Sequence, residues 1–87
     1  MSDESVIEFP CDFPLKVVGR TAPDFQSIVV EIVERHAGQL AENYVRSRPS
    51  RDGTFVALTC LIRAKSKAQL DALYEELSGH ERILMVL

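Results

Sequence analysis

Two hydrophobic periodicities alternate along this chain, and their order constrains the fold more than any other feature of the sequence. A period of two predicts a strand with two different faces, and a period near 3.6 predicts an amphipathic helix. The first segment with a period of two covers residues 13–20, where one face carries Phe13, Leu15, Val17 and Gly19. We therefore expect the first strand there.

The segment after this strand changes to a helical period. Thr21 is the expected N-cap, because a proline and an acid follow it in the first turn. Apolar residues then recur on one stripe until Gly38, which can adopt the left-handed conformation that ends a helix. The stripe consists of Phe25, Ile28, Val29, Ile32, Val33 and His36.

A pair of strands is expected next. They cover residues 42–47 and 54–64, and a turn over residues 49–53 joins them. Pairing Val45 with Val56 would place the apolar residues of both strands on one face. We therefore favour that register.

The last part of the chain predicts one more helix and one more strand. Ser66 and Gln69 form a capping box for a helix over residues 67–78, and Gly79 supplies its end. The apolar residues 82–87 are too few for a useful helix, so we expect an extended strand there.

The resulting order is strand, helix, strand, strand, helix, strand. With right-handed crossovers, two split βαβ units build a four-stranded antiparallel sheet in the spatial order 4-1-3-2, with both helices on one face. We therefore predict an α+β fold, a ferredoxin-like βαββαβ sandwich. The 87 residues allow one domain, over residues 10–87, preceded by a flexible arm over residues 1–9.

Charge and cysteine content exclude several classes of function. The net charge of −3 disfavours a chain that binds nucleic acid or a membrane with its whole surface. The acidic start and the lack of a long apolar run argue against a signal peptide or a membrane span and favour a cytoplasmic protein. Cys11 and Cys60 lack the spacing of metal ligands, so we expect two thiols and no metal site.

The residues that could support catalysis are scattered in the sequence. His36 falls on the apolar stripe of the first helix, and His80 falls in a turn. The acidic residues lie off the apolar stripes, as expected of solvated helix faces. We therefore predict that the protein is not an enzyme and has neither catalytic residues nor a cofactor.

The loop after the first strand is one candidate binding site. Gly19, Arg20 and Thr21 place amide donors, a guanidinium and the positive end of a helix together, which suits a small anionic metabolite. The structural alternative is that Gly19 fits a tight turn and Thr21 only caps the helix.

The sheet face away from the helices is the other candidate site. It is expected to carry Val18, Ala57 and some of Leu84 and Val86, an apolar field that favours a covering partner. The last strand lies at a sheet edge and is apolar on both faces, so it invites pairing with another chain. We expect a homo-oligomer, with a different protein partner as the alternative. The expected interaction surface consists of Tyr44, Arg46, Phe55, Leu61 and Arg63.

Basic residues are concentrated between residues 46 and 67, a segment that contains six basic residues and one acidic residue. A solvated basic hairpin explains them, and an adaptor that binds RNA or protein through Arg46, Phe55 and Arg63 is the alternative. RNA-binding proteins of this fold stack bases on aromatic residues of the first and third strands. Here the first strand offers Lys16 instead, which makes nucleic acid the less favoured partner.

Short fragments spread over nearly the whole chain carry a family resemblance. They are Glu8-Phe9-Pro10, Pro14, residues 16–19, 33–37 and 73–77, and the terminal Met85-Val86-Leu87. Together these fragments resemble the YbeD-like family of small bacterial proteins of unknown function. The resemblance implies the βαββαβ fold and an architecture similar to ACT regulatory domains, which bind amino acids or related small molecules. It thus implies a regulatory role, with Gly19 in the position of the ACT loop glycine.

Overall fold

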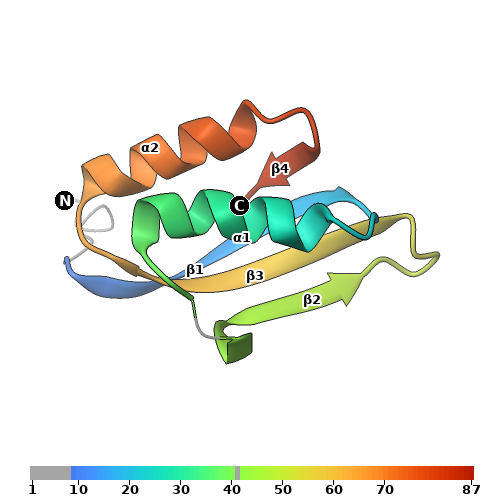
Figure 1. Cartoon of the computed structure of the whole chain (residues 1–87), viewed down its shortest axis with the longest axis horizontal. Helices are drawn as coiled ribbons and strands as arrows, with labels where there is room; N and C mark the ends of the chain where they lie inside the picture. Colours follow the sequence, from blue (N-terminus) through green and yellow to red (C-terminus); the bar gives the residue numbers. More distant parts are fainter. Residues whose placement is uncertain (1–8, 41) are drawn as a thin grey trace, which may run out of the picture.

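A computed structural model describes residues 9–40 and 42–87 of the chain. Residues 1–8, which hold most of the predicted arm, lie outside the described residues. The elements follow the predicted order (Figure 1), namely β1 (Cys11–Arg20), α1 (Phe25–Ala37), the 3-10 turn η2 (Glu42–Tyr44), β2 (Val45–Pro49), β3 (Phe55–Ala64), α2 (Lys67–Ser78) and β4 (Ile83–Val86).

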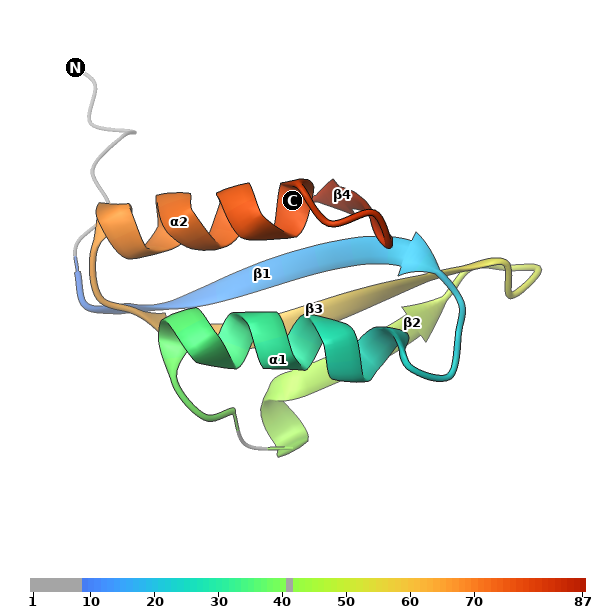
Figure 2. The same cartoon turned by 45° about the horizontal axis from the view of Figure 1, so that its top comes forward.

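The four strands form one antiparallel sheet in the order β2-β3-β1-β4. The two helices lie side by side on one face of it, and the other face is left open (Figure 1, Figure 2). β1 and β3 are the central pair and are matched along their full length, from Cys11 opposite Ala64 to Arg20 opposite Phe55. The predicted ferredoxin-like fold, including its strand order, is confirmed.

The hydrophobic core lies between the sheet and the helices. Alternate residues of β1 and β3 point into it, as the period of two predicts. Among the described residues, none that is polar or charged is buried, so apolar burial is the main stabilising term for this layer. The largest fully buried side chains are Phe25, Leu15, Leu58, Ile62, Leu73 and Leu77.

The predicted register of the β2–β3 hairpin is wrong by four residues, because Val45 pairs with Cys60 and not with Val56. The two registers differ by an even number of residues, so both keep Val45 on the same face and hydrophobic matching cannot separate them. The turn decides between them. There the carboxylate of Asp52 accepts a hydrogen bond from the hydroxyl of Ser50 at 3.0 Å, which orders the turn beyond the end of β2.

The predicted start of the first helix is also wrong, because α1 begins at Phe25 and Thr21 does not cap it. The amide of Thr21 instead donates a hydrogen bond to the carbonyl oxygen of Thr54 at 2.9 Å. Asp24 precedes the helix but makes no capping bond, since its carboxylate pairs with Arg82 at 2.7 Å. The hydrogen bond from Arg82 is also the main cause that lowers the pKa of Asp24.

β4 contains a bulge that changes which of its side chains are exposed. The pairing of β4 with β1 shifts between Val18 and Gly19, which leaves Leu84 as an extra residue. Leu84 and Met85 are therefore both exposed, at 57% and 52%. Val86, expected on the open face, is half-buried and packs against the core. That expectation assumed an unbroken alternation, which the bulge interrupts.

A cluster of polar side chains joins the two helices. The carboxylate of Glu76 on α2 accepts a hydrogen bond from Arg35 at 2.6 Å and lies 2.7 Å from His36 Nε2, and both partners belong to α1. The bond to His36 is the main cause that lowers the pKa of Glu76, and the bond to Arg35 comes next. The position of His36 therefore has a structural explanation in the contact between the helices.

The cysteines have different surroundings. Cys60 is fully buried in β3, and burial raises the pKa of its thiol to about 11, whereas Cys11 is half-buried at the start of β1. Since the thiolate is the reactive form, Cys60 should be nearly inert in the folded protein.

We expect one fast-reacting thiol per chain in a titration with an aromatic disulfide reagent, and two after unfolding. Cys11→Ser should remove the fast phase, and two equally fast thiols in the native protein would contradict this assignment.

Candidate functional site

The open face of the sheet is the most extensive candidate site. Its side chains are the outward residues of the strands, and cross-strand pairs place Lys16 beside Thr59 and Val18 beside Ala57 at its centre. On either side of this small, mixed centre the face divides into two parts of different chemistry. One part lies over β4, and the other lies over the β2–β3 hairpin.

The part over β4 is apolar, and we call it the apolar edge. It consists of Leu84, Met85 and the terminal Leu87, which are 57%, 52% and 59% exposed. Leu87 exchanges backbone hydrogen bonds with Lys16 in both directions, at 2.8 and 3.2 Å, so the chain end is held in the sheet. Three large exposed apolar side chains, two on the short edge strand β4 and one directly after it, make a compact hydrophobic patch.

The part over the hairpin is basic and aromatic, and we call it the hairpin surface. It contains all five residues predicted for the interaction surface and one that was missed, Arg48. The alternation along β2 places Arg46 and Arg48 on the same face, opposite Thr59 and Ala57. The hairpin surface consists of Tyr44, Arg46, Arg48, Phe55, Leu61 and Arg63.

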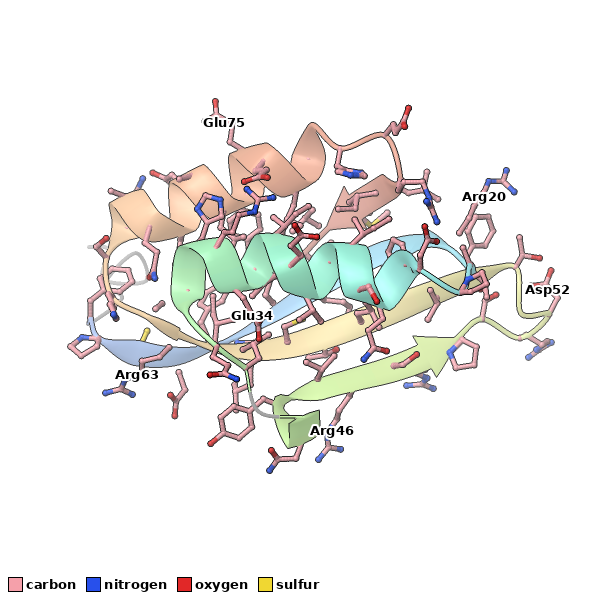
Figure 3. The ribbon with its side chains drawn as sticks, viewed as in Figure 1. Arg20, Glu34, Arg46, Asp52, Arg63 and Glu75 are labelled. Atoms are coloured by element: carbon pink, nitrogen blue, oxygen red, sulfur yellow. The ribbon has the colours of Figure 1, made fainter. Side chains whose placement is uncertain are left out.

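Tyr44 was expected within a strand. It lies instead at the end of η2, just before β2, where the residue is 47% exposed. Figure 3 shows Arg46 and Arg63 on the side of the sheet away from the helices. Arg63 contacts Asp12 of β1 at 3.1 Å. The outward period of β2, read from Arg46, is the signal that could have added Arg48 to the predicted set.

Two shallow pockets lie on the hairpin surface. One is lined mainly by Val18, Arg48, Phe55 and Ala57, and the other by Asn43, Tyr44, Arg46, Thr59 and Leu61. Each therefore combines an arginine with an exposed apolar side chain, since Phe55 and Leu61 are each 37% exposed. Such a combination is typical of a recognition surface.

Charge is distributed unevenly between the two sides of the molecule. The outward residues of the strands include five bases and one acid, which are Lys16, Arg20, Arg46, Arg48, Arg63 and Asp12. On the opposite side, the helices carry five acids and two bases, which are Glu31, Glu34, Asp71, Glu75, Glu76, Arg35 and Lys67. Figure 3 shows this separation for Arg46 and Arg63 against Glu75. The open face is thus positive although the chain is acidic overall.

Gly19, in the predicted metabolite loop, is explained by close packing. A Cβ at this position would lie 2.6 Å from the carbonyl oxygen of Arg82 and would overlap the ring of Phe25. The position therefore requires a residue without a side chain whether or not a ligand binds nearby.

The other two residues of the loop also have partners within the chain. The guanidinium of Arg20 lies 5.6 Å from the ring centre of Phe55, within range of a cation–π contact. The amide of Thr21 donates its hydrogen bond to the carbonyl oxygen of Thr54, as described above. The loop brings Gly19, Arg20 and Thr21 together as expected, and binding of a small anionic metabolite there stays a prediction.

Comparison with known protein families shows to which family the chain belongs. The model of a family described as "Protein of unknown function (DUF493)" matches residues 4–87. This chain belongs to that family. Its relatives are called UPF0250 proteins, the group that includes YbeD, so the resemblance to the YbeD-like family is confirmed. The description names no reaction and no ligand.

Individual family members are similar over their full length. A UPF0250 protein of Nitrosomonas europaea is 41% identical over 87 residues, and both chains are covered completely. A UPF0250 protein of Chromobacterium violaceum is 46% identical over 89 residues, again with both chains covered completely. The solution structure of the C-terminal domain of the MgtC protein from Mycobacterium tuberculosis matches with a TM-score of 0.64, 21% identity and coverage of 94% of this chain and 89% of that one. At this identity the likeness concerns the fold alone.

Two kinds of feature are absent from the described part of the chain. Neither helix there has the length and apolarity needed to cross a membrane. Within residues 9–40 and 42–87, no three His, Cys, Asp or Glu residues are grouped so as to hold a metal ion.

Proposed function

We propose that this DUF493 protein is a non-enzymatic interaction module that forms a homodimer by pairing β4 of two copies. The apolar edge carries this proposal. It combines the unpaired backbone groups of an edge strand with exposed Leu84, Met85 and Leu87 and lacks a charged side chain. Such an edge is a template for another strand unless something protects it.

The opposite edge of the sheet supports the choice of β4. β2 carries Arg46 and Arg48 and ends at Pro49, and charged residues and proline are devices that keep edge strands apart. Two β2 strands would repel each other, because like charges would meet across the pair. Two β4 strands meet no such repulsion.

A twofold axis beside β4 would bring identical residues together, as in most homodimers. Antiparallel pairing of the two β4 strands would join the sheets of both copies and place the two apolar edges side by side. The helices would all remain on one face and the two hairpin surfaces on the other, where they stay accessible. A regulatory role, implied by the likeness to ACT domains, fits such a two-copy platform.

The surroundings of the reactive groups support a role without catalysis. Glu76 holds His36 at the contact between the helices, and Cys60 is enclosed in the core with a raised pKa. The exposed acids of the helices lie on the side away from the open face. The open face is therefore better suited to binding a partner than to catalysing a reaction. A cytoplasmic location stays a prediction.

The molar mass in solution tests the dimer. We expect light scattering on a sizing column to give twice the chain mass of 9.8 kDa at micromolar concentration. Met85→Asp should give a monomer, because it places a charge in the centre of the contact. Ser47→Asp is the matched control, since it adds the same charge to the other edge, and it should remain dimeric.

Circular dichroism should show that both variants are folded. A native protein that runs as a monomer over the same concentration range, or a Met85→Asp variant that keeps the full dimer mass, would refute the proposal.

A further inference from the structure

We infer that the hairpin surface binds an acidic, extended protein segment whose carboxylates meet Arg46 and Arg48 and whose apolar side chains enter the two flanking pockets. This inference rests on the proposed role as an interaction module. It does not depend on the dimer, because the hairpin surface and the apolar edge lie on opposite sides of the sheet centre.

The arrangement of the two arginines defines the charge of the partner. Arg46 and Arg48 are alternate residues of an exposed strand, so their side chains leave the same face about 7 Å apart. Alternate residues of an extended partner have the same spacing. Guanidinium groups bind carboxylates in a planar, two-point geometry, which favours aspartate or glutamate at those positions.

The pockets define the apolar part of the partner. Arg48 shares one pocket with Phe55, and Arg46 shares the other with Tyr44 and Leu61. A bound segment can therefore pair a carboxylate with each arginine and place a side chain such as leucine in each pocket. Burying these exposed apolar groups would stabilise the complex at salt concentrations that weaken ion pairs alone.

Of the other three positive groups of the open face, Lys16 lines neither pocket, and two already have partners within the chain. Arg63 contacts Asp12, and Arg20 lies over the ring of Phe55. No described side chain forms an ion pair with Arg46 or Arg48. These two arginines are therefore the most suitable anchors for an incoming acid.

A second copy of the chain is a poorer occupant of this surface. Its acidic side could stack on the hairpin surface only head to tail, and such a contact extends into a ring or an open chain of copies instead of closing as a pair. Two of its acids are also engaged within the chain, since Glu76 pairs with Arg35 and Asp71 pairs with Lys67. A separate acidic segment meets neither obstacle.

RNA is a poorer occupant for a different reason. Stacking of bases needs exposed rings near the centre of the sheet, and the centre here carries Lys16, Val18, Ala57 and Thr59. Phe55 is the only aromatic residue of β3 and is partly covered by Arg20. The acidic helix side also weakens the attraction of a long polyanion.

Fluorescence anisotropy with three labelled probes tests the inference. The probes are a peptide of alternating glutamate and leucine, the same peptide with serine for leucine, and single-stranded oligouridylate. We expect the glutamate–leucine peptide to bind most tightly. Arg46→Glu/Arg48→Glu should weaken it by at least about tenfold, because both anchors change sign.

The matched control is Lys65→Glu/Lys67→Glu, which changes the net charge equally at exposed positions off the hairpin surface. It should leave the affinity for the glutamate–leucine peptide unchanged. Equal loss in both double variants would show a general charge effect and overturn the inference. Tighter binding of oligouridylate, equal binding of the serine peptide, or no binding of the glutamate–leucine peptide would also overturn it.

The same titrations separate this inference from the dimer. If Met85→Asp is monomeric and still binds the peptide, both proposals stand independently. If the native protein is a monomer but binds the peptide, only the dimer fails. The molar mass of the native protein could also rise above the dimer mass at low salt, while Arg46→Glu/Arg48→Glu keeps the dimer mass. That result would show head-to-tail stacking of copies and would refute the inference of a separate acidic partner.

Discussion

Replacing Phe25 with alanine is expected to lower the free energy of unfolding by about 3–5 kcal/mol. Phe25 is 1% exposed and is the first residue of α1, where its ring reaches the backbone of Gly19 in β1. Removing the ring would leave a cavity between the start of the helix and the sheet. Since small domains are stable by only about 5–10 kcal/mol in total, much of the stability would be lost.

Urea unfolding followed by circular dichroism measures this loss. Phe25→Leu is the control, because it keeps most of the apolar volume and should cost clearly less. Exposed Phe55 offers a second comparison, and Phe55→Ala should change stability little. If Phe25→Ala unfolds at the same urea concentration as the native protein, the packing assigned to the start of α1 is wrong.

Gly19→Ala is expected to lower the free energy of unfolding by about 1–3 kcal/mol, the usual cost of overpacking. The added Cβ would lie 2.6 Å from the carbonyl oxygen of Arg82, which belongs to the backbone just before β4. It would also overlap the ring of Phe25. Both contacts must open to admit the methyl group, so the end of β1 and the start of β4 should move apart.

A double-mutant cycle with Phe25→Leu tests the cause of this loss. Leucine leaves more room beside Gly19, so the two substitutions together should cost less than the sum of their separate costs. Strict additivity would contradict the assigned overlap. If Gly19→Ala instead kept full stability and abolished a thermal shift caused by an amino acid or organic acid, the metabolite site at Gly19, Arg20 and Thr21 would be supported.

The strand order and the bounds of α2 could be predicted because their signals are local. Ser66 accepts a hydrogen bond from the amide of Gln69 at 3.1 Å, as the capping box predicts, and the helix ends before Gly79. The order of elements then leaves few topologies, since crossovers are right-handed. The start of α1 was missed because the amide of Thr21 bonds to Thr54 and the carboxylate of Asp24 pairs with Arg82, and both partners are far away in the chain.

The hairpin surface could be predicted in part, because the alternation of residues along a strand is also a local signal. The alternation along β3 placed Phe55, Leu61 and Arg63 on the open face. The alternation along β2 already places Arg48 on the same face as Arg46. The two pockets, in contrast, depend on which residues of β2 lie opposite β3, and the turn at Asp52 sets that register. A pattern with a period of two contains no information on a shift by an even number of residues.

The sequence by itself determined the periodicities, the order of the elements and therefore the ferredoxin-like fold, because each follows from residues close together in the chain. Only the tertiary structure decided the hairpin register, with the two pockets that depend on it, and the bulge that exposes Leu84 beside Met85. Those features arise from contacts between residues far apart in the sequence. The proposed dimer contact and the proposed partner site both depend on them.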